Sequence, residues 1–528
     1  MSFASHRARL ATLVGLAALS GALLAPSAQA DNDRQQASSP RAAKALAAVQ
    51  DSFAGAGGAD RTIALRDLAA TRSELAPAQR AKADAYLARP TAERRANVRG
   101  DVTYAVEEAT PACDESICVH YVTSTDAAPD PTDLQDASGE PGENGIPDYV
   151  DTVLREMGLI HEQYLAAGYR APKSDGTAGG DSRIDVYIAN IGADGTYGYC
   201  TSDDPRTNVE GAYDVWAYCV LDDDYSEFTA QNTPIDSLRV TAAHEYFHAV
   251  QFGYDYLEDA WLLEATAAWI EDEVYPSVND NRQYLANSPL TRPGLSMDQF
   301  IGEGSLSGWH YGVWIFFRNL SERFPTAEGG LPTIVRDIWD RVDAAGEAPD
   351  QYSWQAVDGA LRARGITAAA AFADFAVGNR LPGRTYAEGA ALRYPTAAPV
   401  GSVVLRDLKT RVVTRKINHL ASATYRFTPK VPAARRLTVT IDAPATVRGS
   451  RAIVTSFAKS GAISRKVVPL NSSTGNGALT VPFGSVKFVE VTLVNASGRF
   501  ACFRNTAFSC QGVPVDDAQP FKLTYRVR

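Results

Sequence analysis

The sequence predicts an α+β fold, in which a region of mixed helices and strands is followed by an all-β sandwich domain. Residues 183–191 alternate apolar and polar side chains, as a strand does. From about 235 onward apolar residues instead recur every three to four positions, as in helices. Near Pro399 the period returns to two, for example at 437–441, and the turn-forming stretch NSSTGNG separates later strands. We therefore place the sandwich at 400–528.

Size and charge limit the class of protein. A chain of 528 residues is too long for one ordinary core, so several domains are expected. The net charge of −11 and the lack of any Lys/Arg run argue against nucleic acid as a partner. Beyond the N-terminal region no apolar run reaches the ~18 residues that a spanning helix needs, so we expect no stable insertion into a membrane.

Residues 1–30 have the pattern of a secretory signal peptide. Arg7 and Arg9 precede an apolar run, and the small residues of Ala28-Gln29-Ala30 form a cleavage site. We therefore expect a secreted, extracellular protein. Residues 31–100 are rich in Ala and Arg at helical spacing. They are either a propeptide that blocks a functional site or an attached helical subdomain, and the sequence leaves both open.

Between residue 101 and the long helical stretch, strands are expected at 102–109, 117–123 and 183–191, with a helix beginning near Asp148. Six cysteines allow 15 pairings, but in an oxidising compartment the simplest expectation is local pairing. The expected bridges are Cys113–Cys118, Cys200–Cys219 and Cys502–Cys510.

The main candidate site is an H-E-x-x-H motif formed by His244, Glu245 and His248. On a helical wheel the two histidines share a small polar face of the predicted helix 235–252, and the opposite face is apolar. Their i, i+4 spacing places both imidazoles within reach of one metal ion at ~2.0–2.1 Å. A second helical segment carries Glu264 among apolar residues, where an uncompensated carboxylate is costly to bury. Binding a cation would remove that cost, and so would surface exposure.

The stretch HEYFHAVQ…WLLEATAAW resembles the gluzincin-type zinc metallopeptidases, the group that includes thermolysin and the alanyl-aminopeptidase-type enzymes. It also resembles secreted bacterial proteins described as metalloproteases. The resemblance implies a zincin-like catalytic domain at 101–399, built from edge strands, the H-E-x-x-H helix and a helical lower part. It also implies His244, His248 and Glu264 as zinc ligands, with Glu245 as the general base.

The third ligand is the less specific part of this resemblance. Fifteen residues separate His248 from Glu264, which is fewer than in those relatives. The link between the two helices must then be tight, or another acid must serve. Asp255, Asp259 and Glu271 are the alternatives.

The resemblance implies a hydrolase that cleaves peptide bonds in a protein or peptide substrate. Three protein ligands leave one zinc position open for water, whose pKa the ion lowers toward ~7. Glu245 would take the proton from that water and pass it to the leaving amine. His310 and Tyr311 are the candidate donors to the oxyanion, with a purely structural Tyr311 as the alternative.

A calcium site is a weaker expectation. The Gly/Pro-rich stretch before the predicted helix at Asp148 offers hard oxygen ligands of the kind that calcium uses. Their spacing differs from that of an EF-hand loop, and acidic turns are usually solvated. The candidate ligands are Asp133, Asp136, Glu143, Asn144 and Asp148.

Two other classes of function make different demands on the sequence. An α/β-hydrolase esterase is not expected, because the chain has no G-x-S-x-G motif. A secreted adhesion or carbohydrate-binding protein with a vestigial metal site stays open, because a C-terminal β-sandwich suits contact with a cell surface or polysaccharide. An intact Glu245 between the two histidines favours the enzyme.

Overall fold

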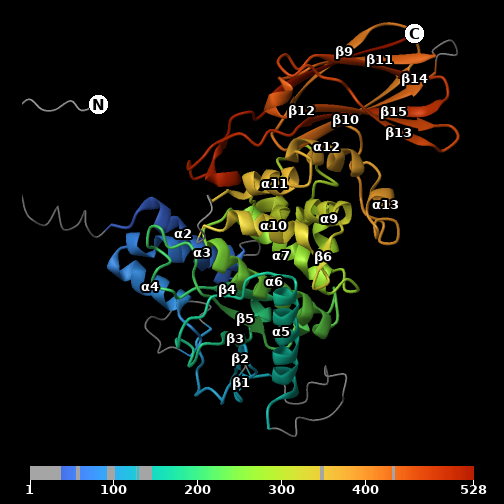
Figure 1. The fold of residues 1–528 in the computed structure, drawn as a ribbon. Coiled ribbons are helices and arrows are strands. Elements are labelled where there is room, and N and C mark those ends of the chain that lie inside the picture. Colours follow the sequence, from blue (N-terminus) through green and yellow to red (C-terminus); the bar gives the residue numbers. More distant parts are fainter. Residues whose placement is uncertain are drawn as a thin grey trace, which may run out of the picture.

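The computed structural model confirms a mixed fold of helices and several sheets (Figure 1). The expected signal peptide lies outside the described residues, as do four of the five calcium candidates: Asp133, Asp136, Glu143 and Asn144. The structure describes residues 37–54, 60–91, 102–125, 128–129, 145–344, 350–430 and 435–528.

A five-stranded sheet lies in the first half of the chain. Its order is β1 (Ala112–Cys113), β2 (Ile117–His120), β3 (Ile184–Ala189), β5 (Tyr218–Asp222) and β4 (Gly198–Thr201). The three inner strands are parallel, whereas β1 and β4 each run antiparallel to their neighbour. Strand β4 therefore lies at one edge of this sheet. The strand predicted at 102–109 is wrong: its Tyr104 instead donates a side-chain hydrogen bond to the carbonyl oxygens of His120 and Ile188.

Helices cover both faces of this sheet. On one face, Val186 and Ile188 share a core with α5 (Asp148–Ala166) and α6 (Pro234–Asp255). On the other face, side chains such as Tyr187 and Tyr218 share a core with the N-terminal helices. These are α2 (Pro40–Phe53), α3 (Arg61–Thr71) and α4 (Pro77–Leu87). The N-terminal helices thus pack as part of the same body.

A helical region follows the sheet and surrounds six buried tryptophans. Its α8 (Trp309–Gly312) and α9 (Trp314–Arg323) meet at Val313. The remaining helices are α7 (Ala260–Val274), α10 (Thr333–Val342), α11 (Ser353–Arg362), α12 (Ala368–Gly378) and α13 (Pro382–Thr385). A small hairpin, β6 (Ala327–Glu328) with β7 (Leu331–Pro332), precedes α10.

The C-terminal region is a two-sheet β structure with one shared apolar core, as the period-two pattern predicted. One sheet has the order β13 (Ile463–Val467), β12 (Ser450–Ala458), β15 (Val486–Asn495), β10 (Ala421–Pro429) and β8 (Gly401–Leu405). The other has the order β14 (Gly477–Pro482), β11 (Arg436–Asp442), β18 (Gln519–Val527) and β9 (Arg411–Ile417). A short pair, β16 (Phe500–Ala501) with β17 (Val513–Pro514), lies outside both sheets.

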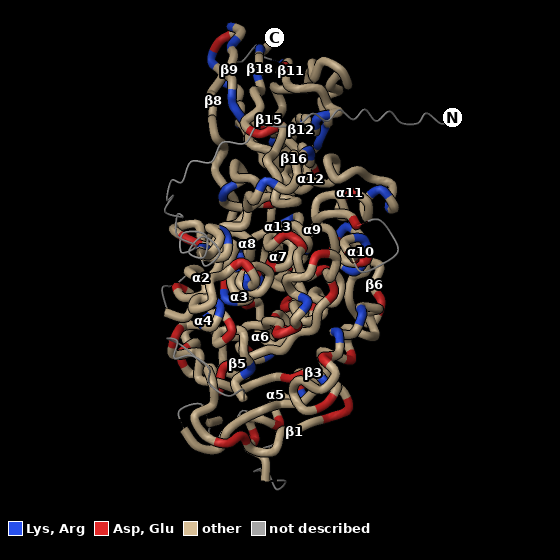
Figure 2. The backbone as a smooth tube through the Cα atoms, turned by 90° about the vertical axis from the view of Figure 1, so that its left-hand side faces the viewer, with Lys and Arg blue, Asp and Glu red and all other residues tan. Residues whose placement is uncertain are grey.

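The sandwich is fastened to the helical region. Ile453 and Val494 belong to the core of the preceding helices, and Asp259 accepts backbone hydrogen bonds from Cys510 and Gln511. The distribution of charge changes at the same boundary (Figure 2). Residues 400–528 contain 20 Lys and Arg and 5 Asp and Glu, whereas the whole chain contains 51 Lys and Arg and 62 Asp and Glu. The acidic excess of the protein therefore lies entirely before the sandwich.

All three expected disulfides are present in the structure: Cys113–Cys118, Cys200–Cys219 and Cys502–Cys510. The second joins β4 to β5 at directly opposed residues, so it fixes the edge strand to the sheet. Within the described part of the chain, no helix combines the length and the apolar character needed to cross a membrane.

Candidate metal centre

Helix α6 carries the motif and begins where the sequence indicates. The Thr233 side chain accepts a hydrogen bond from the Asp236 amide, and Pro234 occupies the first turn, where a missing N–H is harmless. The helix continues past Gly253, the predicted end, to Asp255. Its polar face does not meet solvent either, because His244 and His248 are both buried. The polar face is covered by α7, which makes it an internal site.

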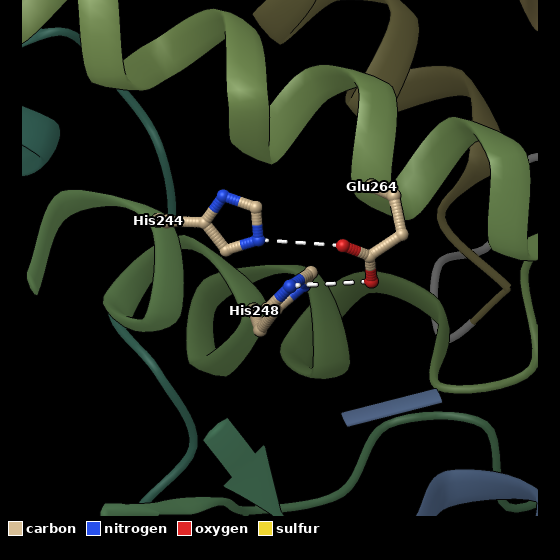
Figure 3. A group of neighbouring side chains, drawn as sticks. All are labelled: His244, His248 and Glu264. Atoms are coloured by element: carbon tan, nitrogen blue, oxygen red, sulfur yellow. Dashed lines mark hydrogen bonds and ion pairs between the residues drawn. The ribbon is translucent and has the colours of Figure 1, made fainter. Parts of the chain in front are cut away.

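A four-residue link reverses the chain between α6 and α7 and brings Glu264 against both histidines (Figure 3). Oε2 of Glu264 lies 3.3 Å from Nε2 of His244, and its Oε1 lies 3.3 Å from Nε2 of His248. The three side chains offer ligand atoms that all lie within 4.8 Å of one another. The short spacing between His248 and Glu264 is thus compatible with convergence.

The far nitrogen of each histidine has its own partner. Nδ1 of His244 lies 2.6 Å from Oε1 of Glu271, and Nδ1 of His248 lies 2.7 Å from Oε1 of Gln251. The Gln251 amide nitrogen donates to the Leu263 carbonyl oxygen, so its oxygen must face His248. Since both partners are acceptors, Nδ1 carries the proton in each neutral ring. The lone pairs of both Nε2 atoms then point at Glu264, the arrangement in which histidine binds a metal.

This arrangement leaves acceptors facing acceptors. Nε2 of His248 and Oε1 of Glu264 are buried and have no hydrogen-bond partner among the described residues. Two ligand atoms ~2.0–2.1 Å from one tetrahedral ion lie about 3.3–3.4 Å apart, which matches both nitrogen–oxygen separations here. Nitrogen and carboxylate oxygen are also ligands that zinc takes in catalytic sites. The residues present therefore fit a zinc ion.

The electrostatics of the group favour a positive charge at its centre. Burial by itself lowers the pKa of His244, but its hydrogen bonds with Glu264 and Glu271 raise that pKa well above its usual value. Burial likewise lowers the pKa of His248, and the negative charge of Glu264 outweighs it. Burial raises the pKa of Glu264, but the two imidazoles hold it well below its usual value. Without a metal ion this site attracts protons, and a dication can replace them.

Glu245 lies one position from His244 and faces a cavity of about 230 Å³ beside the group. Burial raises the pKa of Glu245, although both histidines oppose the shift. Strand β4 forms one wall. A side chain at its Gly198 would meet Cγ2 of Thr241 at 2.8 Å and Cγ of Glu245 at 3.0 Å, so glycine allows α6 to approach the edge strand.

The two candidate oxyanion donors lie differently. Tyr311 lines the cavity, with its ring 5.9 Å from the His244 ring, and its hydroxyl donates to Oδ2 of Asp60 at 2.7 Å. His310 is not among the lining residues; its ring stacks on Phe300 at 4.2 Å. The geometry therefore places Tyr311, rather than His310, beside the candidate metal ligands.

The alternative third ligands lie elsewhere. Asp259 accepts hydrogen bonds from the Ser353 hydroxyl and the Gln511 amide at the junction with the sandwich, and Asp255 accepts one from the Leu257 amide. Neither lines the cavity. Glu271 contacts His244 on the nitrogen that faces away from Glu264. Of the four acids, Glu264 alone lies against Nε2 of both histidines.

Two groups of neighbours have roles in the site that were not predicted. Gln251, on the motif face of α6, and Glu271, which was expected only as an alternative metal ligand, instead contact the outer nitrogens of the imidazoles. Asp60 and Thr62 enter the cavity from the N-terminal helices. No local pattern marks these two, because they lie about 180 residues before the motif.

No protein-family profile matches the chain, and no curated protein matches its sequence. Among solved structures, the pre-peptidase C-terminal domain of a collagenase from Bacillus anthracis aligns at 8% identity over 24% of this chain and 97% of that domain, with a TM-score of 0.16. PliG of Aeromonas hydrophila, a periplasmic inhibitor of g-type lysozyme, aligns at 14% identity over 25% of this chain and 98% of its own, with a TM-score of 0.14. Such low TM-scores support no inference.

Proposed function

We propose that the protein is a secreted zinc-dependent peptidase of the gluzincin type, with a zincin-like catalytic region before its β-sandwich. The observation that carries the proposal is the convergence of two Nε2 lone pairs on the buried carboxylate of Glu264. A metal ion between the three side chains satisfies all of these acceptors at once, without a proton on either Nε2. Glu245, next to this group, is not one of its three ligands and faces the cavity where a substrate would bind.

The roles of the residues follow from their positions. A zinc ion held by His244, His248 and Glu264 would supply Lewis-acid chemistry, polarising a carbonyl and acidifying water. Glu245 is the general base: its raised pKa brings it closer to neutral pH, where proton transfer in both directions is efficient. The Tyr311 hydroxyl, at the cavity wall, is the donor that can stabilise negative charge on the carbonyl oxygen.

Strand β4 supports a peptide as the substrate. It is an edge strand, and Thr196, Tyr197 and Gly198 at its start line the same cavity as Glu245. An extended peptide can add to such an edge through backbone hydrogen bonds, which place a peptide bond beside the base and metal ligands. This geometry favours a protein or peptide substrate over a small ester.

The test combines metal content with catalysis in the purified full chain. We expect one equivalent of zinc in the wild type and in Glu245→Gln, and slow cleavage of a quenched-fluorescence peptide library that a chelator stops. Glu245→Gln should lower cleavage at least about 100-fold, the scale of a lost general base. Glu210→Gln, an exposed glutamate on a loop, is the matched control. A wild type without zinc, or cleavage equal in Glu245→Gln and the control, would refute the peptidase.

A further inference from the structure

We infer that the N-terminal helices hold this centre in a latent state, with the turn formed by Asp60, Arg61 and Thr62 occupying the cleft that a substrate needs. The inference rests on the proposed function and concerns the regulation of the same site. All three residues line the cavity that contains the two histidines, Glu245 and Glu264.

Asp60 engages the candidate oxyanion donor. Its Oδ2 accepts the Tyr311 hydroxyl at 2.7 Å and lies 3.9 Å from Nε2 of His310. The carboxylate is buried close to Glu264, on the cavity side of the metal-ligand group. A substrate carbonyl oxygen needs this same hydroxyl as negative charge develops on it. With Asp60 in place, the Tyr311 hydroxyl already donates to an oxygen of the chain itself.

Thr62 engages the base and the edge strand together. Its hydroxyl oxygen lies 3.3 Å from Oε2 of Glu245, to which it donates, and accepts the Cys200 amide at 3.1 Å. Cys200 lies in β4, and its N–H points to the side of the strand that has no β partner. Such outward N–H groups are the ones that an added peptide strand uses. Thr62 therefore takes a hydrogen-bonding position that the substrate backbone would otherwise fill.

Arg61 helps to seat the turn. Its guanidinium lies over the Phe53 ring at 4.1 Å and the Tyr199 ring at 5.5 Å, and it donates to the Ser52 carbonyl oxygen. Phe53 belongs to α2 and Tyr199 to β4, so this one side chain bridges the N-terminal helices and the edge strand. Three consecutive residues thus contact the base, the oxyanion donor and the substrate-pairing strand.

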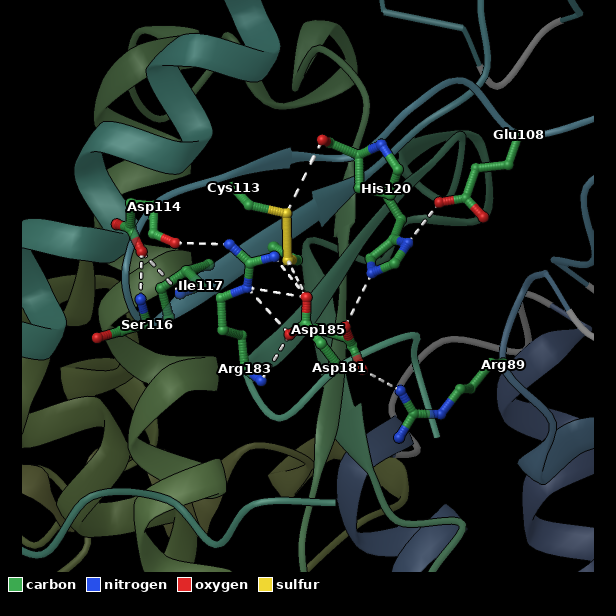
Figure 4. The surroundings of a disulfide bond; sticks show 12 residues. Arg89, Glu108, Cys113, Asp114, Ser116, Ile117, His120, Asp181, Arg183 and Asp185 are labelled. Carbon is green, nitrogen blue, oxygen red and sulfur yellow. Dashed lines mark hydrogen bonds and ion pairs between the residues drawn. A yellow bond between two sulfur atoms is a disulfide. The ribbon is translucent and has the colours of Figure 1, made fainter. Parts of the chain in front are cut away.

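The helices that carry this turn are anchored firmly. Arg89, just after α4, forms ion pairs with Asp175 at 2.6 Å and with Asp203 at 2.7 Å. It also pairs with Asp185 of β3, and Figure 4 shows these two side chains side by side. Breaking a buried ion pair leaves an uncompensated charge, which is strongly unfavourable. The Tyr218 hydroxyl also donates to the Leu87 carbonyl oxygen, and the apolar side chains of α2, α3 and α4 form one core with the sheet. The covered state is therefore the stable state of the full chain.

A purely structural role for Asp60 makes a different prediction. Its Oδ1 accepts the Ile63 amide at 2.9 Å, so Asp60 is also the N-cap of α3. Serine caps helices about as well as aspartate but is too short to reach Tyr311 as the carboxylate does. Asp60→Ser therefore keeps the cap and removes the contact in the cleft. Thr62→Val keeps the volume of a buried side chain and removes both of its hydrogen bonds.

The test compares four full-length proteins: the wild type, Asp60→Ser, Thr62→Val and the control Asp51→Ser. Asp51 is a suitable control because it is an exposed residue of α2. Each protein is titrated with Co²⁺, whose visible spectrum reports its ligand geometry, and then with a peptide hydroxamate in a calorimeter. We expect all four proteins to bind one equivalent of Co²⁺. Asp60→Ser should bind the hydroxamate at least 10-fold more tightly than wild type and cleave quenched peptides at least 10-fold faster. Thr62→Val should show the same direction of change, and Asp51→Ser should match the wild type.

The outcomes separate this inference from the proposed function. If Co²⁺ binds and the hydroxamate affinity and cleavage rate are the same in wild type, Asp60→Ser and Thr62→Val, latency is refuted while the metal centre stands. If Co²⁺ binds to none of the proteins, the metal centre is refuted and latency falls with it. Tighter hydroxamate binding without any peptide cleavage supports a covered metal site and counts against the peptidase.

Discussion

Nε2 of His248 lies 3.3 Å from Oε1 of Glu264, and neither atom has a hydrogen-bond partner within the described residues. Both side chains are fully buried. Leaving a polar atom in this condition costs about 1–3 kcal/mol, and more for a charged group. A protein keeps such an arrangement where a cation relieves it, and this relationship makes Glu264 the first residue to test.

Glu264→Gln should remove high-affinity zinc binding while changing little in volume. The amide keeps the shape of the side chain but loses the charge that holds an ion between the two imidazoles. Saturating zinc should raise the thermal midpoint of the wild type, because a ligand that binds only the folded state stabilises it by roughly 4 kcal/mol at 1,000 times its Kd. The variant should show almost no shift. Asp259→Asn is the control, and a zinc shift lost there but kept in Glu264→Gln would reassign the third ligand.

Glu271→Gln should weaken zinc binding about 10–100-fold without abolishing it. Glu271 contacts Nδ1 of His244 at 2.6 Å and keeps Nε2 of that ring unprotonated toward the site. Partners of this kind typically contribute 10–100-fold to metal affinity. Competition with a chromogenic chelator measures the change. Glu273→Gln, on the same helix but bonded to Ser321, is the matched control. An affinity as low as that of Glu264→Gln would instead make Glu271 a direct ligand.

The sequence was sufficient for the two helices and for the convergence of His244, His248 and Glu264, because these depend on local periodicity and a fixed spacing. The i, i+4 relation of His244 and His248 holds in any helix, and a short link makes α7 return along α6. The end of α6 was missed because Gly253 allows a helix exit without requiring one. Here flanking residues such as Phe252 and Tyr254 are buried, and their packing extends the helix.

Contacts between residues far apart in the chain could not be predicted from the sequence. Thr62 and Glu245 are 183 residues apart, and nothing around Thr62 distinguishes it from other threonines near a helix start. The 102–109 segment has strand-like composition. However, it contacts the neighbouring strands through the Tyr104 hydroxyl, which donates to two backbone carbonyl oxygens, and not through backbone hydrogen bonds of a β-ladder. In both cases tertiary packing decided the outcome over local preference.

Removing the Cys200–Cys219 bridge should reduce stability and catalysis together. The bridge closes a separation of 19 residues, for which chain entropy predicts roughly 3 kcal/mol. Its Cys200 sulfur also contacts the Glu245 carbonyl oxygen, so the bridge supports the base as well as the edge strand. The double variant Cys200→Ser/Cys219→Ser should unfold at lower denaturant and cleave peptides more slowly. Cys113→Ser/Cys118→Ser, at the opposite edge of the sheet, should retain the cleavage rate; equal losses in both would contradict a local role for β4.

The junction with the sandwich should weaken as pH rises from about 6.5 to 9. His419, between β9 and β10, contacts Asp298 through Nε2 at 2.7 Å and Asp517 through Nδ1 at 3.1 Å. Burial by itself lowers the pKa of His419, but the two carboxylates outweigh it and raise that pKa to about 9. A pKa above the unfolded value of about 6.5 means that the folded state binds the proton more tightly. The stabilisation is therefore complete below about pH 6.5 and is lost as pH passes 9.

A shift of this size corresponds to about 3 kcal/mol. The other groups that face His419 are the hydroxyl of Ser296 and the rings of Phe500 and Phe508, none of which is charged. We expect the difference in denaturant midpoint between the wild type and His419→Gln to be large at pH 6 and to shrink toward pH 9.5, since groups away from His419 titrate alike in both proteins. A difference that stays constant over this range would show that His419 contributes through packing, and a difference that grows with pH would reverse the sign of the argument.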